Sequence, residues 1–308
     1  MLSRSISKKP LTGIALNLGA LLVLVSMAGV VKAVSQHVPT GQAVFARSFF
    51  SIPFILAWIA LQGPVMDGLR VSRPRLHLLR GLVGSATLGM NFLALALLPL
   101  PEVTTIGFAA PVLTLIFAAL FLGERVRLFR WTAVGLGLMG VMVVVWPRLS
   151  VAGDVDQMAR LGAMMALGAA ICAAIIKIIV RRMVETETTP SVVFWFAVTA
   201  SLLSLATLPF GWIIPSGEVM ALLVLTGALG GAGQLMMTAS YRFADASTLA
   251  PFWYAQLFFA SAIGYLFFGE LPTGPMMIGA SLVIASGLLI LWRETQLGKE
   301  PQQKTALH

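Results

Sequence analysis

The chain has 308 residues, of which 58% are hydrophobic and only 11% are charged. A soluble domain carries about 25% charged residues, so this chain lacks the polar shell that water would require. Its single cysteine, Cys172, excludes an internal disulfide and a cysteine-based metal site, and we expect neither a metal nor a cofactor. The net charge of +9 does not indicate nucleic-acid binding, because the basic residues lie between apolar runs rather than in one patch.

The first apolar run, from Gly13 to Val34, follows three basic residues and at first sight resembles a signal peptide. The run is too long for the hydrophobic region of a signal peptide, and nine similar runs follow it. We therefore interpret it as the first membrane span.

The remaining apolar runs have the length of membrane helices, which need about 20 mostly apolar residues. The sequence predicts an all-α integral membrane protein with ten transmembrane helices. The expected spans lie near 11–34, 40–62, 75–98, 103–122, 129–147, 161–183, 190–212, 218–241, 246–268 and 274–292.

The distribution of basic residues indicates the orientation of these spans. If the N-terminus is cytoplasmic, 17 of the 21 Lys and Arg residues fall in inside segments, among them Arg80. Cytoplasmic loops carry an excess of Lys and Arg, so we expect both termini in the cytoplasm. The four remaining basic residues are Lys32, Arg47, Arg148 and Arg160.

The two halves of the chain repeat one pattern. Residues 104–147 and 247–293 each contain an apolar run, a Gly-Glu pair at 123–124 or 269–270, and a second apolar run. Five spans in each half place the halves upside down relative to one another, which predicts an inverted repeat of the kind found in transporters. The expected organisation is a first repeat at 11–148, a second repeat at 160–293 and a polar cytoplasmic tail at 294–308.

Several of these stretches resemble a known family. The sequence LLPLPEV at 97–103, Pro111, FLGE at 121–124 and a glycine-rich fifth span are similar to the EamA domain, and the chain over residues 11–293 resembles the ten-span drug/metabolite transporter superfamily. The sequence FARSFFSIP at 45–53 most resembles that of a bacterial subgroup that includes riboflavin transporters and S-adenosylmethionine carriers. The resemblance implies transport of a small metabolite by two rocking halves.

Two basic residues inside spans are candidates for substrate binding or gating. Arg47 lies about seven residues into the second span, where a charge is costly and usually faces a cavity or a partner. The alternatives are that Arg47 reaches the outer headgroups or pairs with Glu102. Lys32, near the outer end of the first span, either reaches the interface or takes part in function. Lys177 is interpreted as an inner-interface residue.

The aromatic residues give a second signal. Trp253 and Tyr254 lie well inside the ninth span, follow Pro251 and precede Gln256, so they either line a pocket or pack between helices. Trp195 and Phe108 are further candidates for the same pocket. Stacked aromatics, an amide and one arginine would suit a flat, polar, ring-bearing solute.

The remaining intramembrane polar residues have ambiguous roles. Asn91 and Gln234 either bind solute or form hydrogen bonds between helices. His37 and His77 are interpreted as surface residues. The acidic residues of the two Gly-Glu pairs, Glu124 and Glu270, are expected to cap the turn that follows each of them.

These residues favour a carrier over other classes of membrane protein. An integral membrane enzyme would need a catalytic constellation such as paired histidines or clustered carboxylates in a span, and a channel would need a filter segment; neither is present in the sequence. No acidic residue stands clearly in the middle of a span as a proton relay. Facilitated or exchange transport by alternating access is therefore favoured over proton coupling.

The substrate is open to several interpretations. Our specific hypothesis is uptake of riboflavin across a bacterial inner membrane. The alternatives are export of amino acids or other metabolites, or transport of S-adenosylmethionine. The expected partners are the small-molecule substrate and the lipid bilayer, with no nucleic acid, and the chain is expected to act as a monomer or a homodimer.

Overall fold

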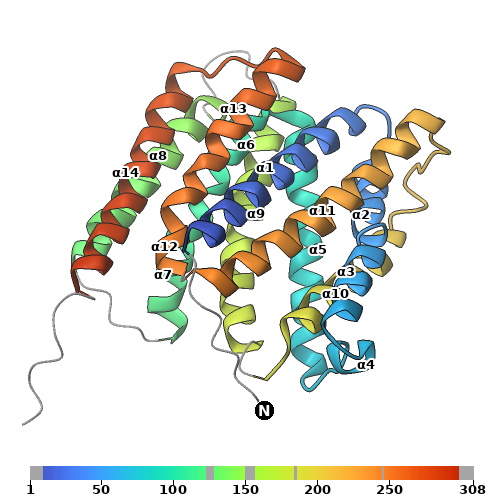
Figure 1. The fold of residues 1–308 in the computed structure, drawn as a ribbon. Helices are drawn as coiled ribbons and strands as arrows, with labels where there is room; N and C mark the ends of the chain where they lie inside the picture. The colour runs from blue at the N-terminus through green and yellow to red at the C-terminus, as the bar shows by residue number, and fades with distance from the viewer. Residues whose placement is uncertain (1–9, 123–127, 150–156, 184–185, 245, 298–308) are drawn as a thin grey trace, which may run out of the picture.

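A computed structural model describes residues 10–122, 128–149, 157–183, 186–244 and 246–297, and these residues form helices joined by short connections (Figure 1). The helices of the first half are α1 (Pro10–Val34), α2 (Thr40–Phe49), α3 (Ile52–Gln62), α4 (Val65–Gly68), α5 (Pro74–Leu97), α6 (Leu100–Gly107), α7 (Ala109–Leu122) and α8 (Leu128–Leu149). Those of the second half are α9 (Gln157–Met183), α10 (Thr189–Leu205), α11 (Gly217–Phe243), α12 (Ala246–Leu249), the 3-10 helix η1 (Ala250–Tyr254), α13 (Ala255–Phe268) and α14 (Gly274–Leu297).

These helices cover the ten predicted spans. Seven helical segments are long and apolar enough to cross a membrane, and three shorter apolar helices occupy the positions of spans seven, nine and ten. Two predicted boundaries differ from the structure. The helix of the predicted seventh span, α10, ends at Leu205 rather than near 212. Helix α14 continues to Leu297, so the start of the predicted tail is helical. Residues 298–308 lie outside the described part of the chain.

Three of the predicted spans are discontinuous, and each break lies beside a proline. The second span breaks between Phe49 and Ile52, just before Pro53, and the fourth breaks at Phe108, three residues before Pro111. Residues 250–254 of the ninth span, which include a proline, form η1. Proline has no N–H to donate and crowds the preceding turn, so a helix tends to end before it. Such breaks are tolerated at membrane depth where protein or a cavity surrounds the backbone.

The helix pairings follow a two-fold relation between the halves. The packing of α1 on α11 has its counterpart in the packing of α5 on α9, because these are the first and third spans of opposite halves. The last long helices of the two halves, α8 and α14, pack on each other and lie side by side at the left of Figure 1. The inverted repeat that the sequence predicts accounts for these exchanged partners.

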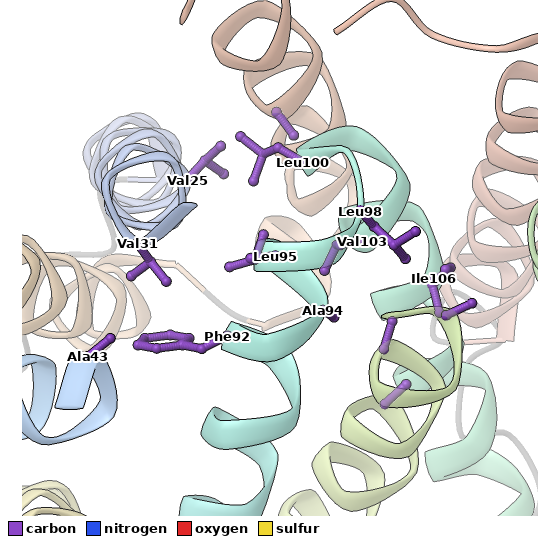
Figure 2. Close-up of a cluster of buried hydrophobic side chains, with 14 of the residues drawn as sticks. Val25, Val31, Ala43, Phe92, Ala94, Leu95, Leu98, Leu100, Val103 and Ile106 are labelled. Carbon is purple, nitrogen blue, oxygen red and sulfur yellow. The ribbon is translucent and has the colours of Figure 1, made fainter. Parts of the chain in front are cut away.

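The core lies between α1, α5 and α6, and it surrounds the break in the fourth span. Val31 of α1 is fully buried and points toward Phe92 and Leu95 of α5, which are 2% exposed (Figure 2). Leu98 and Leu100, at the turn between α5 and α6, are buried in the same cluster. This packing fixes the α5–α6 turn and thereby positions the start of α6.

Glycines allow the closest approach between α8 and α14. A Cβ atom at Gly140 would lie 2.7 Å from the carbonyl oxygen of Gly279, and a Cβ atom at Gly279 would collide with the carbonyl oxygen of Gly140. Without side chains at these two positions the backbones come into direct contact, as small residues allow in membrane helices.

Candidate functional site

A central cavity of about 210 Å³ lies where α5, the break between α6 and α7, α9 and the start of α13 meet. Four of the residues predicted from the sequence line it: Asn91 on α5, Phe108 at the break, Trp253 on η1 and Gln256 on α13. Asn91 and Phe108 come from the first half of the chain, and Trp253 and Gln256 come from the second. The cavity therefore combines aromatic faces with amide groups.

Lys177 of α9 adds a positive charge to this cavity. Its Nζ atom lies 5.6 Å from the centroid of the Trp253 ring, within the range of a cation–π contact. The Nε1 atom of Trp253 is buried and has no hydrogen-bond partner. No aspartate or glutamate is among the described residues that line the cavity. An ammonium and two amides are thus available to a bound solute.

The break in the fourth span positions the aromatic wall of the cavity. Phe108 is the C-cap of α6, and its backbone N–H bonds to the carbonyl of Thr105 at 3.2 Å, which tightens the last turn. Tyr254 packs on Phe108 with ring centroids 5.3 Å apart, and its hydroxyl lies against Gly287, where no side chain interferes. Tyr254 is not among the residues lining the cavity and supports Phe108 instead.

Arg47 lies in a second cavity, of about 150 Å³, which is separate from the central one. Its side chain is 8% exposed, and its Cζ atom lies 5.9 Å from the ring centroid of Phe196 on α10. Arg80 of α5 lies over the same ring at 4.0 Å. Gln234, one of the two predicted amides, also lines this cavity.

The alternative prediction that Arg47 pairs with Glu102 is wrong. Glu102 binds Arg148 through two hydrogen bonds, of 3.0 Å from Nε and 2.9 Å from Nη2. This bidentate pair joins α6 to the end of α8 and leaves Glu102 4% exposed. Arg47 therefore has no acidic partner in Glu102.

Lys32 is tied to the other half of the chain. Its Nζ atom lies 2.7 Å from Oε1 of Glu270 and donates a hydrogen bond of 2.5 Å to the carbonyl of Leu98. The other oxygen of Glu270 accepts the backbone N–H of Leu100 at 2.8 Å, so Glu270 caps α6 in the first half rather than the turn that follows it. The corresponding Glu124 lies outside the described residues.

Trp195 does not line either cavity. Its Nε1 atom donates to the carbonyl of Leu69 at 2.9 Å, and its ring packs edge-on against Phe194 at 5.4 Å. Trp195 therefore holds the turn before α5 against α10. The structure places it outside the group formed by the other predicted aromatic residues.

His77 is buried, which corrects the expectation of a surface residue. Its Nε2 atom lies 3.3 Å from Oε2 of Glu187, in the connection between α9 and α10. Burial raises the pKa of the Glu187 carboxyl, but the backbone N–H of Arg73, the His77 ring and the backbone N–H of Ser72 outweigh it and hold this pKa below its ordinary value. His37, in contrast, is exposed as expected.

Sequence reasoning missed the placement of two basic residues. The charge pattern places Arg80 with the cytoplasmic residues and Lys177 at the inner interface, whereas each contacts an aromatic ring beside a cavity. The available signal was their position: Arg80 lies six residues inside α5, and Lys177 lies six residues before the end of α9. A basic residue at that depth is a candidate for a functional site.

Comparison with known proteins identifies the family. The model of the EamA-like transporter family matches residues 11–146 and 160–292, so the match occurs twice and spans most of the chain. The chain belongs to the EamA-like transporter family. It is a multi-span membrane transporter of the drug/metabolite type.

Relatives within this class differ in their named substrates. The chain is 29% identical to an S-adenosylmethionine uptake transporter of Rickettsia felis over 82% of this chain and 83% of that protein. It is 27% identical to a riboflavin transporter of Rhizobium johnstonii, covering 85% and 84%, and 27% identical to a pseudopaline exporter of Pseudomonas aeruginosa, covering 91% and 93%.

A solved crystal structure has the same fold. It superposes with a TM-score of 0.64 at 21% identity, covering 92% of this chain and 98% of the other.

Proposed function

We propose that this carrier takes up riboflavin, or a closely similar neutral heteroaromatic solute, into the bacterial cytoplasm. The observation that carries the proposal is the composition of the central cavity: Phe108 and Trp253 offer ring faces, while Asn91 and Gln256 offer amides. A flavin ring is flat and apolar on its faces and carries hydrogen-bonding groups on its edge. Aromatic faces with a few fixed polar groups suit such a solute.

The charge of the cavity separates riboflavin from S-adenosylmethionine. The latter carries a sulfonium and an α-ammonium against a single carboxylate, so its net charge is positive, and Lys177 would repel it overall in a cavity whose described lining has no carboxylate. A neutral flavin avoids that repulsion, and its carbonyl oxygens can accept from the Lys177 ammonium beside the Trp253 ring. The names of several relatives make S-adenosylmethionine uptake the second candidate.

Transport follows from the two-fold arrangement. The two repeats rock about the central cavity and expose it to each side in turn. With the N-terminus in the cytoplasm, the Lys32–Glu270 pair lies at the outer end of the bundle, where it closes that side between α1 and α13. Opening to the outside separates this pair.

The first test is uptake in riboflavin-auxotrophic bacteria that lack their own importer. Expression of the chain should restore growth on low riboflavin and give saturable entry of labelled vitamin. Unlabelled riboflavin should compete, whereas the same concentration of S-adenosylmethionine should not.

If riboflavin does not restore growth, further uptake and efflux measurements distinguish the alternatives. Failure to restore growth, with the protein present in the membrane, would remove riboflavin import. Uptake of labelled S-adenosylmethionine by the same cells would then establish the second candidate. Loss of preloaded amino acids or other metabolites would instead establish an exporter.

A further inference from the structure

Two guanidinium groups converge on one aromatic ring in the second cavity. Arg47 comes from α2 and Arg80 from α5, and their Cζ atoms lie 5.9 Å and 4.0 Å from the ring centroid of Phe196. The proposed riboflavin site does not use these side chains, because neither arginine lines the central cavity.

Neither arginine has a compensating charge among the described residues. Nε of Arg47 is buried without a hydrogen-bond partner, as are Nε and Nη1 of Arg80. The described lining of this cavity contains no aspartate or glutamate. Burying a charge without a partner is strongly unfavourable, and two like charges near one ring add repulsion. An unpaired charge at this depth is a candidate for ligand binding.

The surrounding residues are shaped around the two arginines. A Cβ atom at Gly230 would lie 3.1 Å from Nε of Arg47, and one at Gly84 would collide with Nη1 of Arg80 and approach the Phe196 ring to 2.5 Å. Glycine at these positions leaves the space that the guanidinium groups occupy. The cavity also contains polar groups from Ser51, Thr189 and Gln234. The site is therefore cationic and lined in part by polar side chains.

We propose that the second cavity is an oxyanion site that binds a carboxylate or phosphate group between Arg47 and Arg80. The planar guanidinium fork matches the oxygen pairs of carboxylate and phosphate, and a bound anion supplies the opposite charge that both arginines lack among the described residues. Riboflavin carries neither group, so this ligand is a second one. The oxyanion comes either from solution or from a lipid headgroup, which share the same recognition chemistry.

Thermal unfolding of the purified full chain in detergent tests the site. Inorganic phosphate and acetate are titrated against sodium chloride at equal ionic strength, and phosphatidic acid is compared with phosphatidylcholine in mixed micelles. We expect a saturable rise in unfolding temperature with an oxyanion. A rise with phosphate or acetate identifies a free oxyanion, and a rise with phosphatidic acid alone identifies a lipid headgroup.

Variants tie the effect to the two arginines. Arg47→Gln and Arg80→Gln should each lower the apparent oxyanion affinity at least tenfold. They should unfold at the same or a higher temperature without the ligand, because each removes an uncompensated charge. Arg80→Lys keeps the charge but loses the fork and should also weaken binding. The matched control is Arg75→Gln, which changes an exposed arginine on α5, the helix of Arg80. This variant should bind the oxyanion as the wild type does.

The proposal is overturned if no oxyanion stabilises the protein beyond its chloride or phosphatidylcholine control. It is overturned equally if Arg47→Gln and Arg80→Gln respond as the wild type does. Riboflavin is absent from these measurements, so their outcome is independent of the proposed substrate.

Discussion

The ammonium of Lys32 lies 2.7 Å from Oε1 of Glu270, and this ion pair joins α1 of the first half to the end of α13 in the second. The same carboxylate accepts the backbone N–H of Leu100 at the start of α6. Gly269 adopts a left-handed conformation with φ of +66° and turns the chain so that Glu270 can reach both groups. Three elements from both halves are therefore held together at one end of the bundle.

The Lys32–Glu270 pair should contribute a measurable coupling energy. In a double-mutant cycle of Lys32→Met and Glu270→Gln, we expect a coupling of about 1–2 kcal/mol in the free energy of unfolding, because only 13% of each side chain is exposed and the pair includes charge-assisted hydrogen bonds. Denaturant unfolding of the detergent-solubilised protein gives this value. The control for Glu270→Gln is Glu218→Gln, which changes an exposed acidic residue on α11. Additive effects of the two changes would show that the two side chains do not interact energetically.

The contact between α8 and α14 predicts opposite effects for two glycines on one helix. Gly140→Ala should destabilise the protein by about 1–3 kcal/mol, because its Cβ atom would lie 2.7 Å from a backbone oxygen of α14. A Cβ atom added at Gly135 would meet no atom within 4 Å, so Gly135→Ala should stabilise the helix by about 0.5–1 kcal/mol. Unfolding temperatures of the two variants compare them directly. Equal effects would exclude a close helix contact at Gly140.

The contact around Glu187 should weaken in acid. Because the pKa of Glu187 in the folded protein lies below its ordinary value, its ionised form adds stability in full above the unfolded pKa of about 4.3. That stability is lost as the pH falls through the lower folded value. The difference in unfolding temperature between wild type and Glu187→Gln should therefore shrink below about pH 4.3. A constant difference across this range would show that Glu187 does not act through its charge.

The proposed orientation predicts which connections face outward. In a Cys172→Ala background, a cysteine at His37, between α1 and α2, should react with a membrane-impermeant maleimide on intact spheroplasts. A cysteine at Asp67, between α3 and α5, should react only after the membrane is opened. Both positions are exposed, so access to the aqueous side decides the outcome. The reverse pattern would place the N-terminus outside.

Lys177 should determine which charges the central cavity accepts. Lys177→Met removes the ammonium that lies 5.6 Å from the Trp253 ring centroid, so S-adenosylmethionine should become a competitor of riboflavin uptake. Lys177→Arg keeps the positive charge and should still exclude it. Competition curves in cells expressing each variant measure this change. If S-adenosylmethionine competed equally with wild type and Lys177→Met, charge exclusion by Lys177 would be wrong.

The fold was predictable because lipid imposes a strong constraint on sequence. Runs of about 20 apolar residues identified the spans, and the repeated Gly-Glu pairs predicted the duplication. The breaks in three spans follow from Pro53, Pro111 and the proline in η1, although the sequence did not give the residues at which each helix ends.

The candidate site was predictable only in part. Asn91, Phe108, Trp253 and Gln256 were selected as polar or aromatic residues inside spans, and the structure brings them to one cavity. Whether a residue faces a cavity depends on how its helix is rotated against its neighbours. For this reason Trp195 was assigned to the pocket although its indole bonds to a backbone carbonyl, and Lys177 was not. The spacing of residues along one helix carries no information about these partners.

Transport of riboflavin through the central cavity is tested most directly by uptake of the labelled vitamin into proteoliposomes that contain only the purified chain. The wild type should show saturable uptake, and Trp253→Ala should raise the apparent KM at least tenfold by removing a ring face of the cavity. Trp146→Ala removes an indole that is 64% exposed on α8 and should leave uptake unchanged. Equal uptake by all three proteins would show that riboflavin does not pass through this cavity, and no uptake by the wild type would show that riboflavin is not the solute.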